Sequence, residues 1–455
     1  MKNIKELKIS VISIILLLLS FDVFADTLIK ARKEMISDLE ANWDLNSFSS
    51  SQAIIRELTL KDYIRIGLSR NPGLRSAFYK WKAELNKISV EFSLPDPKFS
   101  YTNYLESVET RVGPQEHAYS ISQKIPLPDK LGIKKNRQFH TSEEFYFKFQ
   151  QKKLEMIYHI TESYFEYAYL AKSIAITEEN INLLKSIENA VQAKYASGIA
   201  QNQDVLKLQV EIEKLKSDLL SLKTQQLPLM SRLRGLLNLP EDIFLPWPDE
   251  SFEQIMLGEV FSDPENLILE LKENNKEIKS LSEHIEKRKG GLKLSRREYF
   301  PDLTIGLTKI DTGDAFNPAT IDSGKDPVIL KFTFNIPLWF GRNKARINTA
   351  RSLLQAAEDS KIGKVKDLEY KVFTIHYKLK DASRQSKLYK TSLIPKAEQT
   401  LEATKAAYEA GKTDFLSLID VQRMLLQFQL AYYRFTATSY QKLAEMKYIL
   451  GIEEF

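Results

Sequence analysis

Cysteine is absent from all 455 residues of the chain. Without it the chain has neither a disulfide framework nor the lipid-bearing cysteine of an exported lipoprotein. Long apolar runs are missing too. The run from Ile9 to Leu19 is shorter than the roughly 20 residues that a membrane-spanning helix needs, and no later run is long enough. Any part of the chain that crosses a bilayer therefore has to use strands.

Glycine and proline are scarce, with 16 of each, and neither occurs between Ile133 and Ser197. Because both residues interrupt helices, residues 133–197 are predicted to form one helix, roughly 98 Å long at 1.5 Å per residue. The stretch 342–410 predicts a second long helix. It contains Gly363 and Pro395, and we expect it to bend near the proline.

The chain also lacks a strong excess of either positive or negative charge. The chain has 65 Lys and Arg against 60 Asp and Glu, a net charge of +5, and both signs are interspersed along the helical stretches. This pattern is typical of solvated helix faces. It indicates that nucleic acid is not a partner.

The N-terminus has the three parts of a secretory signal peptide. A basic start is followed by the apolar run, and Val23-Phe24-Ala25 provides small residues before Asp26. We predict a signal peptide over residues 1–25, with cleavage after Ala25. Residues 26–57 are interpreted as an N-terminal extension, to which no fold is assigned.

Two stretches 213 residues apart share one plan. Tyr195-x-x-Gly198 returns as Tyr408-x-x-Gly411, and each glycine is placed to end one helix and let the chain turn into the next. Apolar residues then recur in steps of 3 and 4, the heptad spacing of helices packed lengthwise. They are Val205, Leu208, Ile212, Leu215, Leu219 and Leu222, and later Leu418, Val421, Leu425, Phe428, Tyr432 and Phe435. The chain thus predicts a tight helical hairpin twice, with returning helices at 203–236 and 415–450.

Four segments alternate apolar and polar residues with a period of two, at 97–107, 115–125, 302–311 and 327–337. Each is about the 9–11 residues that a tilted membrane strand needs. In the last segment the polar residues include Lys331 and Thr333. The apolar residues opposite them are predicted to face lipid: Val328, Leu330, Phe332, Phe334 and Ile336.

These elements repeat in order. Residues 58–240 and 264–455 each begin with a helix, continue with two strands and a long helix, and end with the returning helix. A proline-rich linker over 241–263 joins them, and a kink is expected at Pro72 in the first helix. We interpret the chain as an internal twofold repeat.

Four strands are too few for a membrane barrel, because the smallest barrels have about eight and open edges are not tolerated in lipid. The chain is therefore expected to oligomerise. The predicted fold class is an α+β membrane protein in which three chains, with four strands each, form a transmembrane β-barrel and a long α-helical barrel.

The whole layout resembles the TolC-like outer membrane efflux proteins. The resemblance is carried by the duplicated Tyr-x-x-Gly hairpin, by Leu58-Thr59-Leu60, by Asn71-Pro72 and by the Ile-Pro-Leu exits at 125–127 and 336–338. The stretches 94–97 and 112–115 are similar to a branch found beside heavy-metal and drug exporters. The resemblance implies a homotrimeric exit duct in the outer membrane of a Gram-negative bacterium, with a periplasmic helical domain.

The same resemblance implies the partners. They are a periplasmic adaptor protein, an inner-membrane transporter that is expected to be proton-driven, and outer membrane lipid. It implies neither enzyme activity nor a cofactor, and the sequence shows no nucleophile, phosphate loop or carboxylate pair. The sequence does not identify the exported substrate.

By the same resemblance, the duct closes at the hairpin tips, where tyrosine, basic and acidic residues link neighbouring helices. Tyr408 and Asp420 match the pattern, whereas Thr413 and Ser417 depart from it. Alternatives remain open at this point: Asp204 and Asp414 suit helix N-capping, and Asp420 suits an ion pair with Arg423 at i+3. The gate candidates are Tyr195, Asp204, Tyr408, Asp414, Asp420 and Arg423.

The histidines show no pairing at i+3 or i+4, so surface or tunnel lining is favoured over metal ligation. They are His117, His140, His159, His284 and His376. A soluble periplasmic coiled-coil scaffold, with the two strand pairs packed on each other, is the alternative to the duct. It explains the heptads but not an apolar face on every strand.

Overall fold

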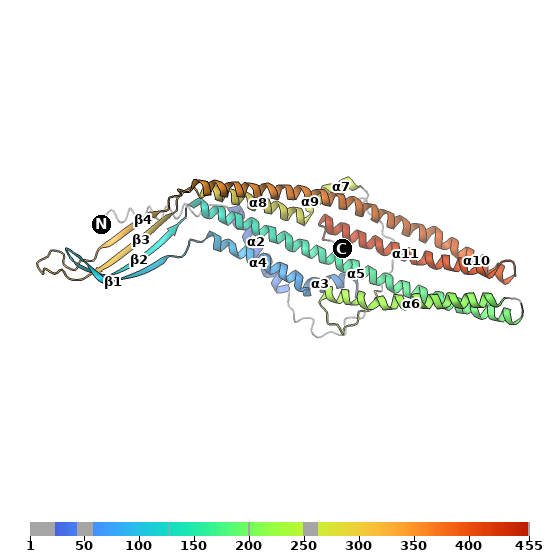
Figure 1. Cartoon of the computed structure of the whole chain (residues 1–455). Helices are drawn as coiled ribbons and strands as arrows, with labels where there is room; N and C mark the ends of the chain where they lie inside the picture. The colour runs from blue at the N-terminus through green and yellow to red at the C-terminus, as the bar shows by residue number, and fades with distance from the viewer. Residues whose placement is uncertain (1–22, 43–57, 127, 199–200, 249–262, 454–455) are drawn as a thin grey trace. The chain divides into compact units, whose positions relative to one another are not determined.

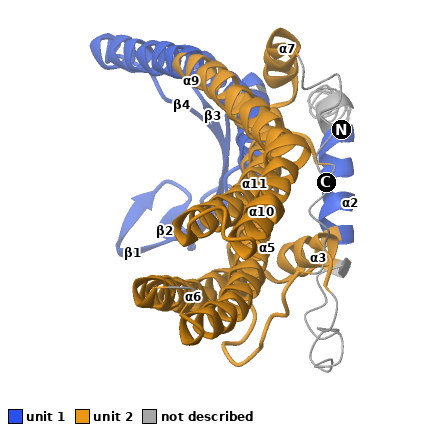
Figure 2. Ribbon diagram, turned by 90° about the vertical axis from the view of Figure 1, so that its right-hand side faces the viewer, with its two compact units in different colours: residues 1–38, 79–147, 279–362 blue, residues 39–78, 148–278, 363–455 orange. Residues whose placement is uncertain are grey.

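The computed structural model describes residues 23–42, 58–126, 128–198, 201–248 and 263–453 (Figure 1). Of the predicted signal peptide only residues 23–25 are described, and most of the linker lies outside the described residues as well. The chain forms two compact units. Unit 1 comprises residues 1–38, 79–147 and 279–362, and unit 2 comprises residues 39–78, 148–278 and 363–455 (Figure 2).

Unit 1 contains one antiparallel sheet, ordered β1-β2-β3-β4 (Figure 1). Its strands are β1 (Lys98–Thr110), β2 (Gly113–Ile125), β3 (Leu303–Thr312) and β4 (Val328–Phe334). The two predicted strand pairs do not form separate layers, because β2 pairs with β3 from Ile125 opposite Leu303 onward. The outer strands β1 and β4 are the two edges of the sheet.

The register gives the sheet one apolar face. A row across all four strands reads Phe99, Ile121, Leu307 and Leu330. All four side chains are exposed, from 48% for Leu307 to 69% for Phe99. Since residues directly opposite each other point to the same side of a sheet, most of the large apolar residues of the four strands share this face.

The opposite face is polar and carries small side chains. One of its rows reads Ser100, Ser120, Thr308 and Ile329, and the hydroxyls of Thr308 and Ser120 are 3.1 Å apart. A second row runs Lys124, Thr304 and Thr333. The sheet therefore has the two-sided character that the alternation in the sequence predicts.

The last strand is shorter than predicted, since β4 ends at Phe334 and Ile336 lies beyond it. Pro337 cannot donate to a strand ladder and restricts the residue before it. The backbone turns here instead, with the Leu338 N–H donating to the Ile336 carbonyl at 3.0 Å. Ile336 is 73% exposed but is not part of the strand face to which we assigned it.

The first half of the chain contains helices α2 (Val23–Asn42), α3 (Leu60–Arg70), α4 (Pro72–Phe92), α5 (Pro128–Ala196) and α6 (Asn202–Leu237). The break predicted at Pro72 separates α3 from α4. The long helix α5 begins at Pro128 and not at residue 133, because proline is well suited to the first helical position, where no N–H is needed.

The second half contains α7 (Pro264–Asn274), α8 (Lys276–Arg297), α9 (Phe340–Leu388), the π-helical turn η2 (Tyr389–Leu393), α10 (Ile394–Glu409) and α11 (Phe415–Leu450). The stretch 342–410 is thus not one α-helix. Pro395 lacks an N–H and its ring crowds the preceding turn, and the chain widens to a π turn just before it. None of the described helices is both long and apolar enough to cross a membrane.

Helix α2 lies where no fold was assigned from the sequence. Arg32 donates to the Glu143 carboxylate on α5 at 2.8 and 3.0 Å, and its guanidinium lies 3.5 Å from the ring centroid of Tyr146. Ile36, one helical turn after Arg32, is buried. Such a helix is stabilised by partners more than 100 residues away, which local periodicity does not reveal.

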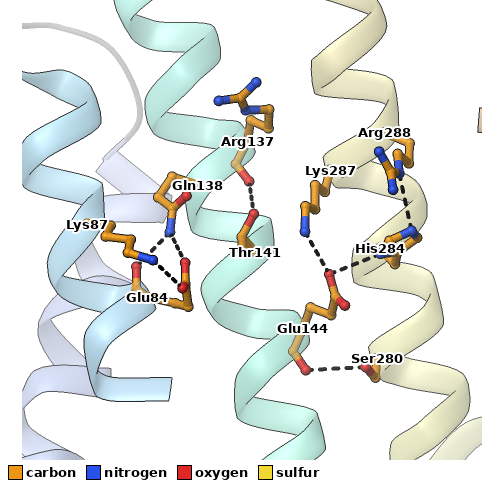
Figure 3. A network of polar contacts seen from close by, with 10 residues as sticks. All are labelled: Glu84, Lys87, Arg137, Gln138, Thr141, Glu144, Ser280, His284, Lys287 and Arg288. Atoms are coloured by element: carbon orange, nitrogen blue, oxygen red, sulfur yellow. Dashed lines mark hydrogen bonds and ion pairs between the residues drawn. The ribbon is translucent and has the colours of Figure 1, made fainter. Parts of the chain in front are cut away.

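Figure 3 shows the polar contacts of α5 with α4 and α8 in unit 1. On one side Gln138 donates to the Glu84 carboxylate of α4 at 2.8 Å. On the other side Glu144, whose side chain is 6% exposed, accepts from Lys287 of α8 at 3.3 Å and lies 3.1 Å from His284 Nδ1. Buried polar groups are thereby paired on both sides of α5.

In unit 2 two asparagines, Asn71 and Asn275, form equivalent hydrogen bonds at the starts of α4 and α8. Asn71 accepts from the Leu74 N–H and donates to the Leu236 carbonyl at the end of α6, both at 3.1 Å. Asn275 accepts from the Ile278 N–H at 2.8 Å and donates to the Ile449 carbonyl at the end of α11 at 2.7 Å. Each side chain caps one helix and satisfies the end of another.

We expect Asn275→Ala to lower the free energy of unfolding by about 2–4 kcal/mol, because it removes a cap and leaves a buried carbonyl without a donor. Asn275 is 5% exposed, whereas Asn71 is half-buried. Asn71→Ala is therefore the matched control and should cost about half as much, since water can replace its lost bonds. Thermal unfolding followed by circular dichroism measures both, and equal losses would contradict the role of burial.

Candidate functional site

The two hairpin turns of unit 2 are built alike. Gly198 and Gly411 have φ of +73° and +71°, a conformation that residues with a Cβ rarely adopt. The Gly198 N–H donates to the Tyr195 carbonyl at 2.9 Å, and the Gly411 N–H donates to the Tyr408 carbonyl at 3.1 Å. Each helix thus ends in a tight left-handed turn, as the Tyr-x-x-Gly spacing predicts.

Capping accounts for the positions of both acidic residues beside these turns. Asp414 is the N-cap of α11, and its carboxylate accepts from the Ser417 N–H at 3.0 Å and from the Ser417 hydroxyl. These hydrogen bonds hold the pKa of Asp414 below its ordinary value. Asp204 accepts from the backbone N–H of Gln201, the N-cap of α6. Both carboxylates are bound to their own helices.

Tyr408 connects the second hairpin to the first. Lys194, in the last turn of α5, donates to the Tyr408 carbonyl at 3.3 Å and lies 4.4 Å from the centroid of its ring. The ring packs on Phe415 with centroids 5.8 Å apart, and burial raises the pKa of the Tyr408 hydroxyl. Tyr195, the corresponding tyrosine of the first hairpin, is 48% exposed.

Helix α11 has two buried seams, where the heptad pattern predicted one. Leu418, Leu425 and Tyr432 of the predicted seam are buried. The second seam packs into a cluster with α5 and α6 and consists of Phe415, Ile419, Gln422 and Leu426. The buried Gln422 of this second seam donates to the Asn180 side chain of α5 at 2.6 Å.

Arg423 forms the strongest polar link between α11 and α6. It donates to the Glu211 carboxylate at 2.5 Å and, on its own helix, lies 3.3 Å from Asp420. The Glu211 side chain is 6% exposed, that of Arg423 46% and that of Asp420 69%. The hydrogen bond from Arg423 holds the pKa of Glu211 below its ordinary value.

Sequence analysis missed Glu211 as a site residue. It precedes Ile212 of the heptad seam, so its helix position placed it at the edge of a packed face. Arg423 lies 212 residues further along the chain, and no local pattern joins the two. Asp420 is the weaker partner of Arg423, and its carboxylate stays mostly in solvent.

A second link ties α11 to α5. Arg434 donates to both carboxylate oxygens of Glu166 at 2.8 and 3.0 Å, and Gln441 donates to the same carboxylate at 3.0 Å. Burial opposes ionisation of Glu166, but these hydrogen bonds outweigh it and hold the pKa below the ordinary 4.5. The charged form is therefore the one that the fold stabilises.

Because the folded-state pKa of Glu166 is depressed, its contribution is present above pH 4.5 and is lost as the pH falls through the folded-state value. We expect Glu166→Gln to lower stability by about 1 kcal/mol at pH 7, after allowance for partial exposure. The deficit should shrink toward pH 3. Thermal unfolding at both pH values measures it, with the exposed Glu213→Gln as control; a deficit independent of pH would contradict this assignment.

Two histidines pair with single carboxylates. His140 Nδ1 lies 2.7 Å from Glu283, and His284 Nδ1 lies 3.1 Å from Glu144. Within the described stretches, no three His, Cys, Asp or Glu residues lie close enough together to hold a metal ion. The polar groups described at the hairpin tips hold helices together.

The second half of the chain matches a known protein family. Residues 267–452, from α7 to the end of α11, match the family described as outer membrane efflux protein. This part of the chain is therefore similar to the outer membrane efflux proteins. The resemblance drawn from the sequence is thereby confirmed, and the matched residues include the second hairpin with Tyr408 and Asp420.

Two curated proteins resemble parts of this chain. Cobalt-zinc-cadmium resistance protein CzcC of Cupriavidus metallidurans is 25% identical over 189 residues, which are 41% of this chain and 43% of CzcC. Toxin and drug export protein A of Aggregatibacter actinomycetemcomitans is 25% identical over 217 residues, which are 46% of this chain and 47% of that protein. The chain spans just under half the length of these relatives.

Solved structures share the fold over most of the chain. A membrane protein from Pseudomonas aeruginosa has a TM-score of 0.72 at 15% identity, covering 86% of this chain and 90% of that one. The outer membrane protein VceC of Vibrio cholerae has a TM-score of 0.70 at 14% identity, covering 86% and 96%. At these identities the likeness shows that this chain has their fold.

Proposed function

We propose that this protein is an outer membrane efflux protein and the exit duct of a tripartite efflux system. Three copies form a β-barrel in the outer membrane of a Gram-negative bacterium and a helical tunnel in the periplasm. A proton-driven inner-membrane transporter delivers solutes to the duct through a periplasmic adaptor protein. The protein carries out no chemistry, and the transporter supplies the energy.

The sheet is the observation that carries this proposal. Its exposed apolar face suits lipid, its hydroxyl-rich face suits water, and the loops of its two hairpins are joined to each other. Gly313 donates to the Pro114 carbonyl and Gly324 to the Val112 carbonyl, both at 2.8 Å. Among the described residues, the edge strands β1 and β4 each have a neighbour on one side only, and lipid does not tolerate open edges. Pairing β4 of one copy with β1 of the next closes the ring.

Exposed apolar residues on the helices support the same assembly. On α6 they recur at heptad spacing on the side away from the core, and on α9 they follow one stripe. They are Leu206, Val210, Leu220 and Leu227, each at least 54% exposed, and Tyr370, Phe373 and Tyr377, each at least 51% exposed. Neighbouring copies would cover these stripes.

An internal twofold repeat is part of the proposal. The equivalent roles of Asn71 and Asn275 and the equal turns at Gly198 and Gly411 support it. So does the shared order of helices and strands in 58–240 and 264–455. The two halves of each chain then give a trimer six similar units.

The hairpin tips are proposed as the periplasmic gate. Tyr195, Asp204, Tyr408, Asp414, Asp420 and Arg423 lie at or near the two turns, and Glu211 joins them as the partner of Arg423. Lys194–Tyr408 and Glu211–Arg423 bind the second hairpin to the first. Breaking such links would let the second hairpin move away from the pore axis.

Names of the relatives bear on the cargo class. CzcC is a cobalt-zinc-cadmium resistance protein, and the second relative is a toxin and drug export protein. A duct passes what its transporter loads, so divalent metal ions and drugs are both proposed cargo classes for this chain. The match of residues 267–452 to the outer membrane efflux proteins disfavours the soluble periplasmic scaffold.

Cell fractionation and cross-linking test the proposal. We expect the protein in the outer membrane fraction, released only by detergent, because the apolar sheet face would otherwise meet water. Cross-linking of the solubilised protein is expected to stop at three subunits. Recovery as a periplasmic protein in salt buffer, or a stable monomer in lipid, would refute the duct.

A further inference from the structure

The polar face of the sheet carries a row that ends in lysine on both edges. Lys98 on β1 lies opposite Ser122, Ser122 opposite Gly306, and Gly306 opposite Lys331 on β4. The two residues between the lysines are small, so no bulky side chain covers either ammonium group. Lys98 and Lys331 are both exposed, and neither has an ion-pair partner among the described residues.

The next row toward the helices adds a third lysine, Lys124, opposite Thr304. Lys124 lies 3.0 Å from the Asp302 carboxylate, which also lies 2.7 Å from Lys130 at the start of α5. One aspartate is thus shared between two lysines. It compensates neither Lys98 nor Lys331.

Acidic residues of β1 and β2 lie toward the opposite end of the sheet. Glu106 lies within the irregularity between Asn103 and Val108, Glu109 follows it, and Glu116 lies at the irregularity between Gln115 and His117. Lys309 lies on the apolar face at this end of the sheet. It forms ion pairs with Asp311 at 2.8 Å and with Asp326 at 2.9 Å. The uncompensated positive charge is confined to the helix end of the polar face.

We propose that Lys98 and Lys331 form an anion-attracting belt inside the barrel, which makes the duct favour anionic solutes at this level. This rests on the proposed function, in which the polar face lines the lumen. Within one chain the two lysines are three strand spacings apart, roughly 14 Å. Where β4 of one copy meets β1 of the next, Lys331 and Lys98 lie on adjacent strands.

Three copies place six lysines around the lumen, two at each boundary between copies. A narrow passage with one sign of charge and low-dielectric walls raises the local concentration of counterions, as rings of lysine do in anion pores. The belt acts on solutes in transit. It is separate from the hairpin tips, which lie in the other unit.

The test is ion selectivity in planar lipid bilayers. The protein is reconstituted under a KCl gradient, and the reversal potential gives the permeability ratio of chloride to potassium. We expect K98Q/K331Q to lower this ratio by about threefold or more, because six positive charges leave the lumen. K98R/K331R keeps the charge and should retain the ratio. Lys33→Gln, an exposed lysine of α2 outside the sheet, should retain it as well.

Single variants make the test robust. K98Q and K331Q each remove three of the six charges, and each should produce an intermediate shift even if the double variant does not assemble. Inorganic triphosphate should reduce the current of the unsubstituted channel more than that of either variant. An unchanged ratio in conducting variants would overturn the lysine belt alone. No conductance from the unsubstituted protein would overturn the proposed duct.

Discussion

Leu330→Lys is expected to lower stability in the membrane by about 2–4 kcal/mol and to prevent assembled protein from accumulating in the outer membrane. Leu330 belongs to the row that is apolar on all four strands, and it is 53% exposed on that face. In the proposed barrel, this position meets the hydrocarbon of the bilayer. A charge there has neither water nor an acidic partner.

The neighbouring residue provides a matched control. Ile329 is 46% exposed on the same strand, and its side chain points to the opposite, polar face beside Thr308. Ile329→Lys introduces the same charge in place of a residue of the same size. We expect it to cost at most about 1 kcal/mol, since the lumen is hydrated. Outer-membrane yield and heat stability of the trimer on gels measure both variants, and equal damage would show that the faces are reversed.

Local patterns in the sequence were sufficient for the elements themselves. Alternation with a period of two located all four strands to within a few residues, and the Tyr-x-x-Gly turns located both hairpins. These features depend on residues that are neighbours in the chain, so one sequence displays them. Boundaries shifted where a proline acts, at Pro128, Pro337 and Pro395.

Long-range partners were not predictable in the same way. Helix α2 depends on Glu143 and Tyr146, and β2 pairs with a strand from the other half of the chain. The second seam of α11 breaks the simple heptad, because this helix packs on two sides at once. In the sequence, Glu211 has no feature that distinguishes it from an ordinary glutamate of a helix, because its partner Arg423 is 212 residues away. Periodicity shows which face is buried but not what buries it.

Arg423→Ala is expected to loosen the hairpin tips and to raise single-channel conductance. The variant leaves the Glu211 carboxylate, 6% exposed, without its partner at 2.5 Å. Breaking a fully buried pair costs about 3–5 kcal/mol. Since the Arg423 side chain is 46% exposed, we expect about 1–3 kcal/mol here. That loss favours a tip in which α11 has separated from α6 and Glu211 is hydrated.

Asp420→Ala tests the charge of the proposed pore without breaking the Glu211–Arg423 ion pair. Asp420 shares Arg423 at 3.3 Å but is 69% exposed, so its removal leaves Glu211–Arg423 in place. Three copies around one axis at roughly 6 Å would repel by about 3 kcal/mol per pair at an effective dielectric of 20, and they should attract divalent cations. We expect Asp420→Ala to reduce current block by such cations added from the periplasmic side, with conductance and trimer yield unchanged.

Planar-bilayer recordings of both variants at two salt concentrations distinguish the roles. The combination Glu211→Gln with Arg423→Ala should conduct no more than Arg423→Ala alone, because the two residues act as one link. Additive increases would show that Glu211 and Arg423 act independently and not as one link. If Asp420→Ala leaves cation block unchanged, Asp420 is only a solvent-exposed partner of Arg423, an i+3 pair worth a few tenths of a kcal/mol. The constriction would then lie closer to the turn, where Asp414 and Tyr408 remain.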